Sequence, residues 1–103
     1  MNVLMEFAIF PTDKGISVSE YVSKVVQMVR ESGYEYRLTA MGTIVETPNM
    51  KAATDILYQA QQVLEPHASR IYCTATFDIK ISEGGRLTQK INSIESKIGK
   101  VNQ

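Results

Sequence analysis

The chain has 103 residues, in which eleven lysines and arginines balance eleven aspartates and glutamates. A net charge of zero gives no basic field to attract nucleic acid or a membrane surface, so neither is expected as a partner. A single cysteine excludes an internal disulfide, and a single histidine disfavours a zinc site. No stretch reaches the roughly 18 apolar residues of a membrane span, so we expect one cytoplasmic domain, residues 1–103.

The first third of the chain predicts a strand and a helix. Residues 2–10 form an almost unbroken apolar run, which predicts a central strand with both faces buried and with Pro11 at its end. Ser17 and Glu20 have the spacing of a capping box, which predicts the start of a helix. Valines then recur at helical spacing until Gly33, which is expected to end that helix.

A hairpin is predicted next. Residues 36–41 and 43–47 have strand character and meet at Gly42, which we expect to adopt a positive φ in a tight turn. If this turn has two residues, Arg37 lies directly opposite Glu46.

The second half predicts a helix, a strand and a terminal helix. The first helix begins near Pro48 and ends by Pro66, and residues 70–82 then alternate between apolar and polar side chains. After Gly84 and Gly85, a last amphipathic helix is marked by Leu87, Ile91, Ile94 and Ile98. The resulting order predicts an α+β fold: a ferredoxin-like βαββαβ sandwich with a four-stranded antiparallel sheet and an extra C-terminal helix.

Glu6 is the unusual residue of the first strand. Its neighbours at alternate positions, Val3, Met5, Phe7 and Ile9, are all apolar and are expected to face the helices, so Glu6 points to the other face. The same alternation places Arg37 and Glu46 on the face of Glu6. That face also carries much apolar surface, so we expect a second copy of the chain to cover it, in a homodimer or homotetramer.

Two interpretations of the two carboxylates stay open. Glu6 and Glu46 can be interface charges neutralised by Arg37, Lys80 or a neighbouring subunit. They can also belong to a small-molecule site for an amine-bearing heterocycle, because hydroxyl-bearing side chains accompany them. These are Thr39, Thr43, Thr74, Thr76 and Tyr72.

Catalysis is disfavoured. No nucleophile with an adjacent base and no glycine-rich phosphate loop accompanies the carboxylates, so we expect no enzyme, no catalytic residue, no metal and no resident cofactor. Cys73 alternates with apolar neighbours on the helix-facing side of its strand, which predicts an inert core thiol.

Several short motifs together resemble one known family. They are Glu6 followed by Pro11, residues 19–22 (Ser-Glu-Tyr-Val), Gly33, residues 41–46 (Met-Gly-Thr-Ile-Val-Glu), Arg70, Lys90 and Ser93. They resemble the small thiamine-binding-like proteins of bacteria and archaea, whose tandem-domain relative binds thiamine and its hydroxymethylpyrimidine portion. The resemblance covers nearly the whole chain.

The resemblance implies a ferredoxin-like fold, dimers and tetramers, and binding of a thiamine-type pyrimidine without chemistry on it. Carried over by position, the expected ligand-binding residues are Glu6, Thr39, Thr43, Glu46 and Thr74. One carboxylate is expected to engage the aminopyrimidine edge, and nearby negative charge to favour the thiazolium cation.

An alternative function also fits the predicted strand order. Amino-acid-sensing domains of the ACT type share it and commonly bind ligand through a glycine-bearing loop after the first strand, where this chain has Gly15. An ACT-like regulatory or structural oligomerisation module that senses another small metabolite is therefore the second hypothesis.

Overall fold

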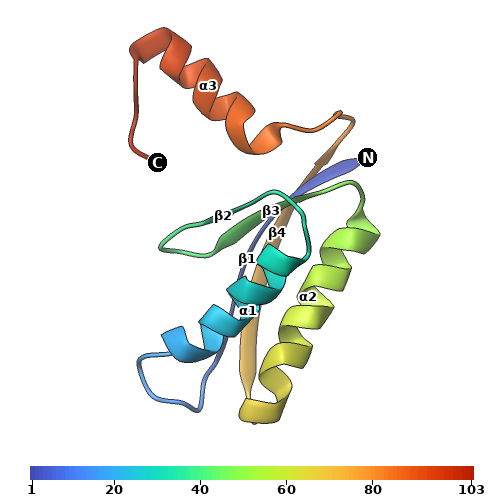
Figure 1. The fold of residues 1–103 in the computed structure, drawn as a ribbon, viewed down its shortest axis with the longest axis vertical. Coiled ribbons are helices and arrows are strands. Elements are labelled where there is room, and N and C mark those ends of the chain that lie inside the picture. Colours follow the sequence, from blue (N-terminus) through green and yellow to red (C-terminus); the bar gives the residue numbers. More distant parts are fainter.

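Four strands form one antiparallel sheet in the order β2-β3-β1-β4 (Figure 1), in a computed structural model that describes residues 1 to 103. The strands are β1 (Asn2–Pro11), β2 (Tyr36–Leu38), β3 (Thr43–Thr47) and β4 (Ile71–Lys80). The helices are α1 (Ser19–Glu31), α2 (Met50–Leu64), the short 3-10 helix η1 (Glu65–His67) and α3 (Arg86–Ile98). This arrangement confirms the predicted ferredoxin-like α+β fold, with β1 and β3 in the centre.

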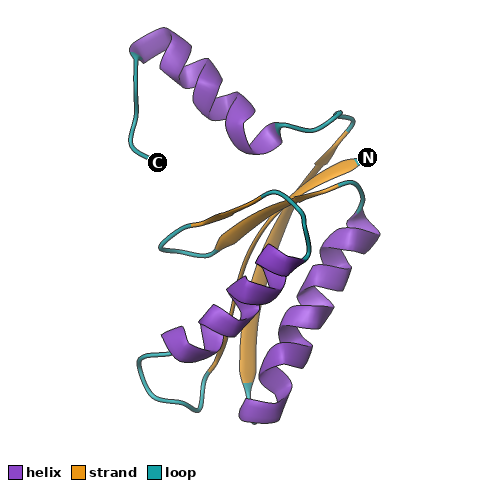
Figure 2. Cartoon of the chain, viewed as in Figure 1, coloured by secondary structure: helices purple, strands orange, loops and turns teal.

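The core lies between the sheet and the pair α1 and α2, which cover the same face (Figure 2). Strand alternation directs one set of β1 side chains into it, and Val3 and Met5 are completely buried. Burial of each such side chain contributes about 1.5–3 kcal/mol. The remaining core side chains are Phe7, Ile9, Val25, Val29, Val45, Ala53, Ile56, Ala60 and Leu64.

The opposite face of the sheet is open in a single chain. Glu6 is exposed, while Leu4, Ala8 and Phe10 of the same face are only partly buried. The prediction that both faces of this strand are buried is therefore wrong for the isolated chain, because both packed helices lie on one side of the sheet.

The edge strand β4 is also less covered than expected. Cys73 pairs with Ile9 and so lies on the helix-facing side, yet it is exposed, as are Phe77 and Ile79 farther along. The prediction of a core thiol is wrong, because on this edge strand only Ile71 and Ala75 pack against the core and Cys73 between them stays exposed.

The start of α1 differs from the predicted capping box. The N-cap is Val18, which makes no side-chain cap hydrogen bond, and its carbonyl accepts the amides of Tyr21 and Val22. Ser17 lies one residue outside the cap, so its pairing with Glu20 is not formed. Asn49 does cap α2, because its side chain accepts a 2.8 Å hydrogen bond from the amide of Ala52.

The hairpin has a longer loop than predicted. Leu38 pairs with Thr43, so four residues, 39 to 42, connect the strands, and Arg37 lies opposite Ile44 rather than Glu46. The hydroxyl of Thr39 closes the loop: it donates to the carbonyl of residue 42 at 2.9 Å and accepts the amides of residues 41 and 42.

Gly42 is required for close approach and not for its torsion angle. Its φ is not positive, so the predicted reason for a glycine here is wrong. A Cβ added at this position would lie 2.7 Å from the backbone oxygen of Phe7, closer than side chains tolerate. Glycine therefore lets the hairpin loop lie directly against β1.

Helix α3 extends beyond the strand ends, away from α1 and α2 (Figure 1). Its apolar stripe is mostly uncovered, with Ile94 and Ile98 exposed, and Arg86 is its one buried residue. No helix of the chain combines the length and apolar character needed to cross a membrane.

Candidate functional site

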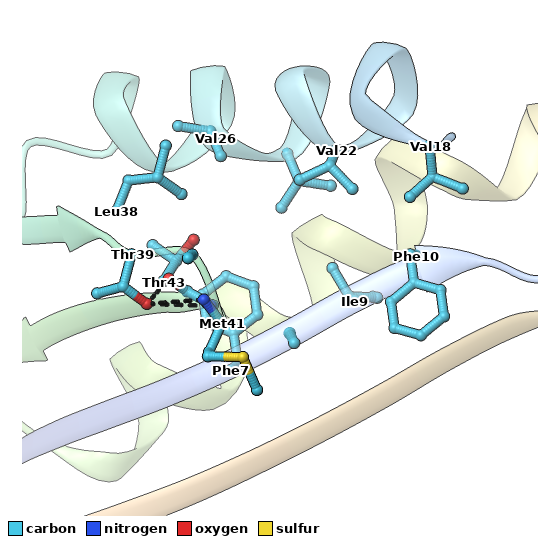
Figure 3. A pocket seen from close by; sticks show the side chains of 14 residues that line it. Phe7, Ile9, Phe10, Val18, Val22, Val26, Leu38, Thr39, Met41 and Thr43 are labelled. Atoms are coloured by element: carbon cyan, nitrogen blue, oxygen red, sulfur yellow. Dashed lines mark hydrogen bonds between the residues drawn. The ribbon is translucent and has the colours of Figure 1, made fainter. Parts of the chain in front are cut away.

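A cavity of about 170 Å³ lies between α1, β1 and the hairpin loop (Figure 3). Val18, Val22 and Val26 of the α1 segment form one wall, and the opposite wall comes from β1. Eleven of its 14 lining residues are hydrophobic, and none carries a titratable side chain. The other labelled residues are Phe7, Ile9, Phe10, Leu38, Thr39, Met41 and Thr43.

Two threonine hydroxyls reach this cavity. Thr39 belongs to the hairpin loop, where its hydroxyl already makes three hydrogen bonds. Thr43 is buried at the start of β3, and none of the side-chain hydrogen bonds of the chain involves its hydroxyl. Thr43 faces the helices because it pairs with Phe7, whose side chain is in the core.

Glu6 lies on the other face of the sheet, in hollows of about 250 and 80 Å³. Thr76 pairs directly with it, and Thr74 lies two residues along β4 beside the smaller hollow. The Glu6 carboxylate takes part in none of the chain's ion pairs or side-chain hydrogen bonds. The smaller hollow shares Phe7 and Met41 with the apolar cavity, so the two sites adjoin at the hairpin loop.

The Glu46 carboxylate is already bound by other groups of the protein. Its carboxylate accepts hydrogen bonds from the Arg86 amide at 2.9 Å and from the Asn2 side chain at 3.0 Å. It therefore caps the N-terminus of α3, a favourable place for a negative charge. Neither Arg37 nor Glu6 is its partner.

Arg86 was not anticipated from the sequence. Its buried guanidinium donates to the backbone oxygens of Asn2 (3.2 Å) and Asp78 (2.8 Å), and forms a 2.8 Å ion pair with the Asp78 carboxylate. A cation in the first turn of a helix is unfavourable for the helix dipole, and that was the signal that this arginine has partners elsewhere.

The structure thus divides the five predicted site residues among three places. Thr39 and Thr43 line the apolar cavity, Glu6 and Thr74 lie at the hollow on the open face, and Glu46 holds α3. No group of three or more His, Cys, Asp or Glu side chains is arranged to hold a metal.

The loop from β1 to α1 is tied to the start of β4. The Asp13 carboxylate accepts hydrogen bonds from the Ser69 hydroxyl at 2.6 Å and the Ser69 amide at 3.0 Å, which lower the pKa of Asp13. In the same loop, a side chain added at Gly15 would meet nothing within 4 Å. The suggested role of Gly15 in an ACT-like site stays a prediction.

Comparisons with known proteins agree with this fold and identify the family to which the chain belongs. A family model described as thiamine-binding protein matches residues 5–95. A UPF0045 protein of Mycobacterium bovis is 26% identical over 95 residues, which span 92% of this chain and 93% of the relative.

Solved structures share the architecture. The hypothetical protein MJ1052 of Methanocaldococcus jannaschii superposes with a TM-score of 0.78 at 26% identity, over 90% of this chain and 95% of that one. Protein TM0486 of Thermotoga maritima, described as a candidate thiamine biosynthesis/salvage protein, shares the fold (TM-score 0.75, 18% identity, 91% and 99% coverage). Because the family model spans most of the chain, this protein belongs to the thiamine-binding protein family.

Proposed function

We propose that the protein binds thiamine, or its hydroxymethylpyrimidine part, and does not change it chemically. The observation that carries this proposal is the apolar cavity under α1, in a chain that belongs to the thiamine-binding family. No titratable side chain lines the cavity, and this supports binding without turnover, because neither threonine hydroxyl there has a general base beside it.

The size of the cavity favours one ring of the ligand. An apolar cavity of roughly 150 Å³ is known to accept benzene, so about 170 Å³ suits a substituted six-membered ring. Thiamine has two rings, and the second must lie outside. We therefore place the pyrimidine in the cavity and the thiazolium at its mouth.

Glu6 supplies the charge that a thiazolium cation requires. Its carboxylate lies in the hollow that adjoins the cavity at Met41 and has no partner in the protein. An exposed carboxylate attracts a cation modestly through water, and more strongly where the ligand itself excludes water. Thr74 and Thr76 offer hydroxyls at the same hollow.

A second copy of the chain is proposed to cover the open face, in a dimer or a dimer of dimers. Large apolar side chains stand exposed there and on α3, and a closed homo-oligomer is the commonest way to bury such a surface. They include Met41 and Tyr72 at the open face and Ile98 on α3. Sedimentation equilibrium measures the mass directly, and a monomer at 100 µM would contradict this part of the proposal.

Calorimetric titration with thiamine and with hydroxymethylpyrimidine tests the ligand class. Both ligands should release or absorb measurable heat and raise the melting temperature, since they bind only the folded chain. Absence of heat and of thermal stabilisation at millimolar ligand would overturn the proposal. A parallel screen of amino acids tests the ACT-like alternative, which stabilisation by an amino acid alone would support.

Two variants locate the site. Val22→Phe places a ring in the cavity and should weaken both ligands at least tenfold, whereas Val63→Phe, at a half-buried valine of α2 outside the cavity, should leave both affinities unchanged. Glu6→Gln should weaken thiamine and leave the uncharged hydroxymethylpyrimidine unaffected. Equal loss of both ligands in Glu6→Gln, with full binding by Val22→Phe, would move the pyrimidine to the open face.

A further inference from the structure

The edge of β1 contains a break in the hydrogen-bond ladder at the floor of the cavity. In an antiparallel sheet, the amide and carbonyl of alternate residues point to opposite neighbouring strands. On β1 the odd positions point to β3, since the Phe7 oxygen lies against Gly42 and Phe7 pairs with Thr43. The even positions of β1 point to β4. Thr12, the even position just past the end of β1, follows this rule and donates its amide to the Arg70 oxygen at 2.9 Å.

Ile9 therefore directs its amide and its carbonyl toward the β3 side, where β3 is missing. β3 begins only at Thr43, and the position that would face Ile9 is Met41 in the hairpin loop. The Met41 amide is turned instead to the Thr39 hydroxyl at 3.2 Å. None of the backbone hydrogen bonds outside the helices and strands involves Ile9, and Ile9 lines the cavity.

The free edge is one residue long. The next odd position is Pro11, which has no amide hydrogen, and Thr12 after it is already bound to Arg70. A peptide strand added here would find only one complete donor and acceptor pair. A compact planar molecule fits this edge better than an added strand does.

The chemistry of the missing partner follows from the sheet. A residue in the facing strand would exchange two hydrogen bonds with Ile9, as acceptor for its amide and donor to its carbonyl. An aromatic ring with an acceptor nitrogen next to an exocyclic amine presents the same pair in one plane. A 4-aminopyrimidine has this edge.

We propose that the backbone of Ile9 recognises the aminopyrimidine edge of the ligand, with the ring nitrogen accepting from the amide and the amine donating to the carbonyl. This inference rests on the proposed function and assigns recognition of the ring to the main chain instead of to a carboxylate. The apolar walls hold the ring faces, and the buried location keeps water from competing for the two hydrogen bonds.

Nuclear magnetic resonance of the ¹⁵N-labelled protein tests the free state first. Without ligand, the Ile9 amide should exchange with solvent deuterium at least tenfold faster than the Phe7 amide, which is in the ladder. With saturating thiamine its exchange should slow at least tenfold and its proton resonance should move downfield. An Ile9 amide as protected as Phe7 without ligand would overturn the inference.

The 4-oxo analogue of thiamine tests the direction of the hydrogen bonds. It has the same size and charge, but its ring nitrogen donates and its oxygen accepts, so it should bind at least tenfold more weakly than thiamine. Equal affinity, or thiamine binding that leaves the Ile9 amide unperturbed, would overturn this inference and leave the proposed function standing. Failure of thiamine and hydroxymethylpyrimidine to bind at all would instead overturn the proposed function.

Discussion

The two faces of the sheet differ in how much of their surface one chain can bury. On the helix-covered face, Met5 and Val45 are completely excluded from solvent. On the open face, their neighbours Leu4 and Ile44 are only partly buried, and Glu6 is exposed. The same strands thus carry a finished core on one side and an incomplete surface on the other.

This difference shows where a ligand can be accommodated. The core face is filled by α1 and α2 except beside the start of β3, and there the cavity and the unpaired edge of Ile9 coincide. The open face supplies a carboxylate beside the same point. Recognition of an apolar ring and of a charge can therefore be divided between the two faces.

The largest difference between the faces is expected from two truncations at adjacent positions. Met5→Ala removes a fully buried side chain and should lower the free energy of unfolding by about 2–5 kcal/mol. Leu4→Ala, on the open face, should cost about 1 kcal/mol or less in a single chain, because the site is already partly hydrated. Urea denaturation of both variants measures this contrast.

Repeating the urea denaturation at several protein concentrations tests whether a second copy covers the open face. If a second copy covers the open face, the cost of Leu4→Ala should rise with protein concentration, and that of Met5→Ala should not. Equal costs for the two variants at low micromolar concentration would contradict the assignment of the two faces.

The junction between the sheet and α3 should show the next largest effect. Arg86→Met removes a buried guanidinium and leaves the Asn2 and Asp78 oxygens without their donor, so the free energy of unfolding should fall by about 2–3 kcal/mol. Circular dichroism should show a loss of helix as α3 separates from the strand ends.

Arg70→Met is the matched control for this junction. Arg70 is exposed at the start of β4 and its side chain forms none of the chain's ion pairs, so its replacement should change stability by less than about 0.5 kcal/mol. Equal destabilisation by the two replacements would show that the Arg86 contacts do not hold α3.

The two carboxylates of the open face should respond differently to neutralisation. Glu46→Gln removes a negative charge from the N-terminus of α3 and should cost about 0.3–1 kcal/mol, with a smaller cost at high salt. Glu6→Gln removes a charge that has no partner and should leave stability unchanged or slightly higher. Thermal unfolding at two salt concentrations compares them, and a larger loss for Glu6→Gln would mean that Glu6 has a structural partner.

The fold was predictable because each of its elements depends on a local pattern. The apolar run of residues 2–10 predicts the strand, and the helical spacing of the valines predicts the helix that follows. The order of the elements then gives the topology. The apolar set of β1, from Val3 to Ile9, was assigned to the correct face for the same reason.

The site was less predictable because it depends on register and loop geometry. A hairpin loop of four residues instead of two separates Arg37 from Glu46, and only the pairing of Thr43 with Phe7 shows that this threonine faces the helices. The unpaired edge of Ile9 depends on the residue at which β3 begins, and no residue type in the hairpin indicates that position. The partners of Arg86 lie 84 and 8 residues away in the chain, beyond any local pattern.

The smallest effect is expected at Cys73, on the uncovered edge of the helix-facing side. Partial desolvation raises the pKa of its thiol above the ordinary value of 9.0, because burial penalises the thiolate. Since only the thiolate reacts with iodoacetamide, Cys73 should react more slowly at pH 8 than the thiol of a short peptide, although it is exposed.

The pH dependence of that reaction separates an exposed edge from a buried one. The rate should keep rising with pH through 9.0 and level off only above it, and the unfolded chain should react with the ordinary profile. Because the folded state holds the thiol proton more tightly than the unfolded state, Cys73 lowers stability as pH rises from 9.0 through its raised pKa. Cys73→Ser should remove this loss, and an inflection of the rate below 9.0 would mean that a neighbouring positive charge stabilises the thiolate. Complete protection at every pH, lost on dilution, would instead indicate that a second chain packs on this edge.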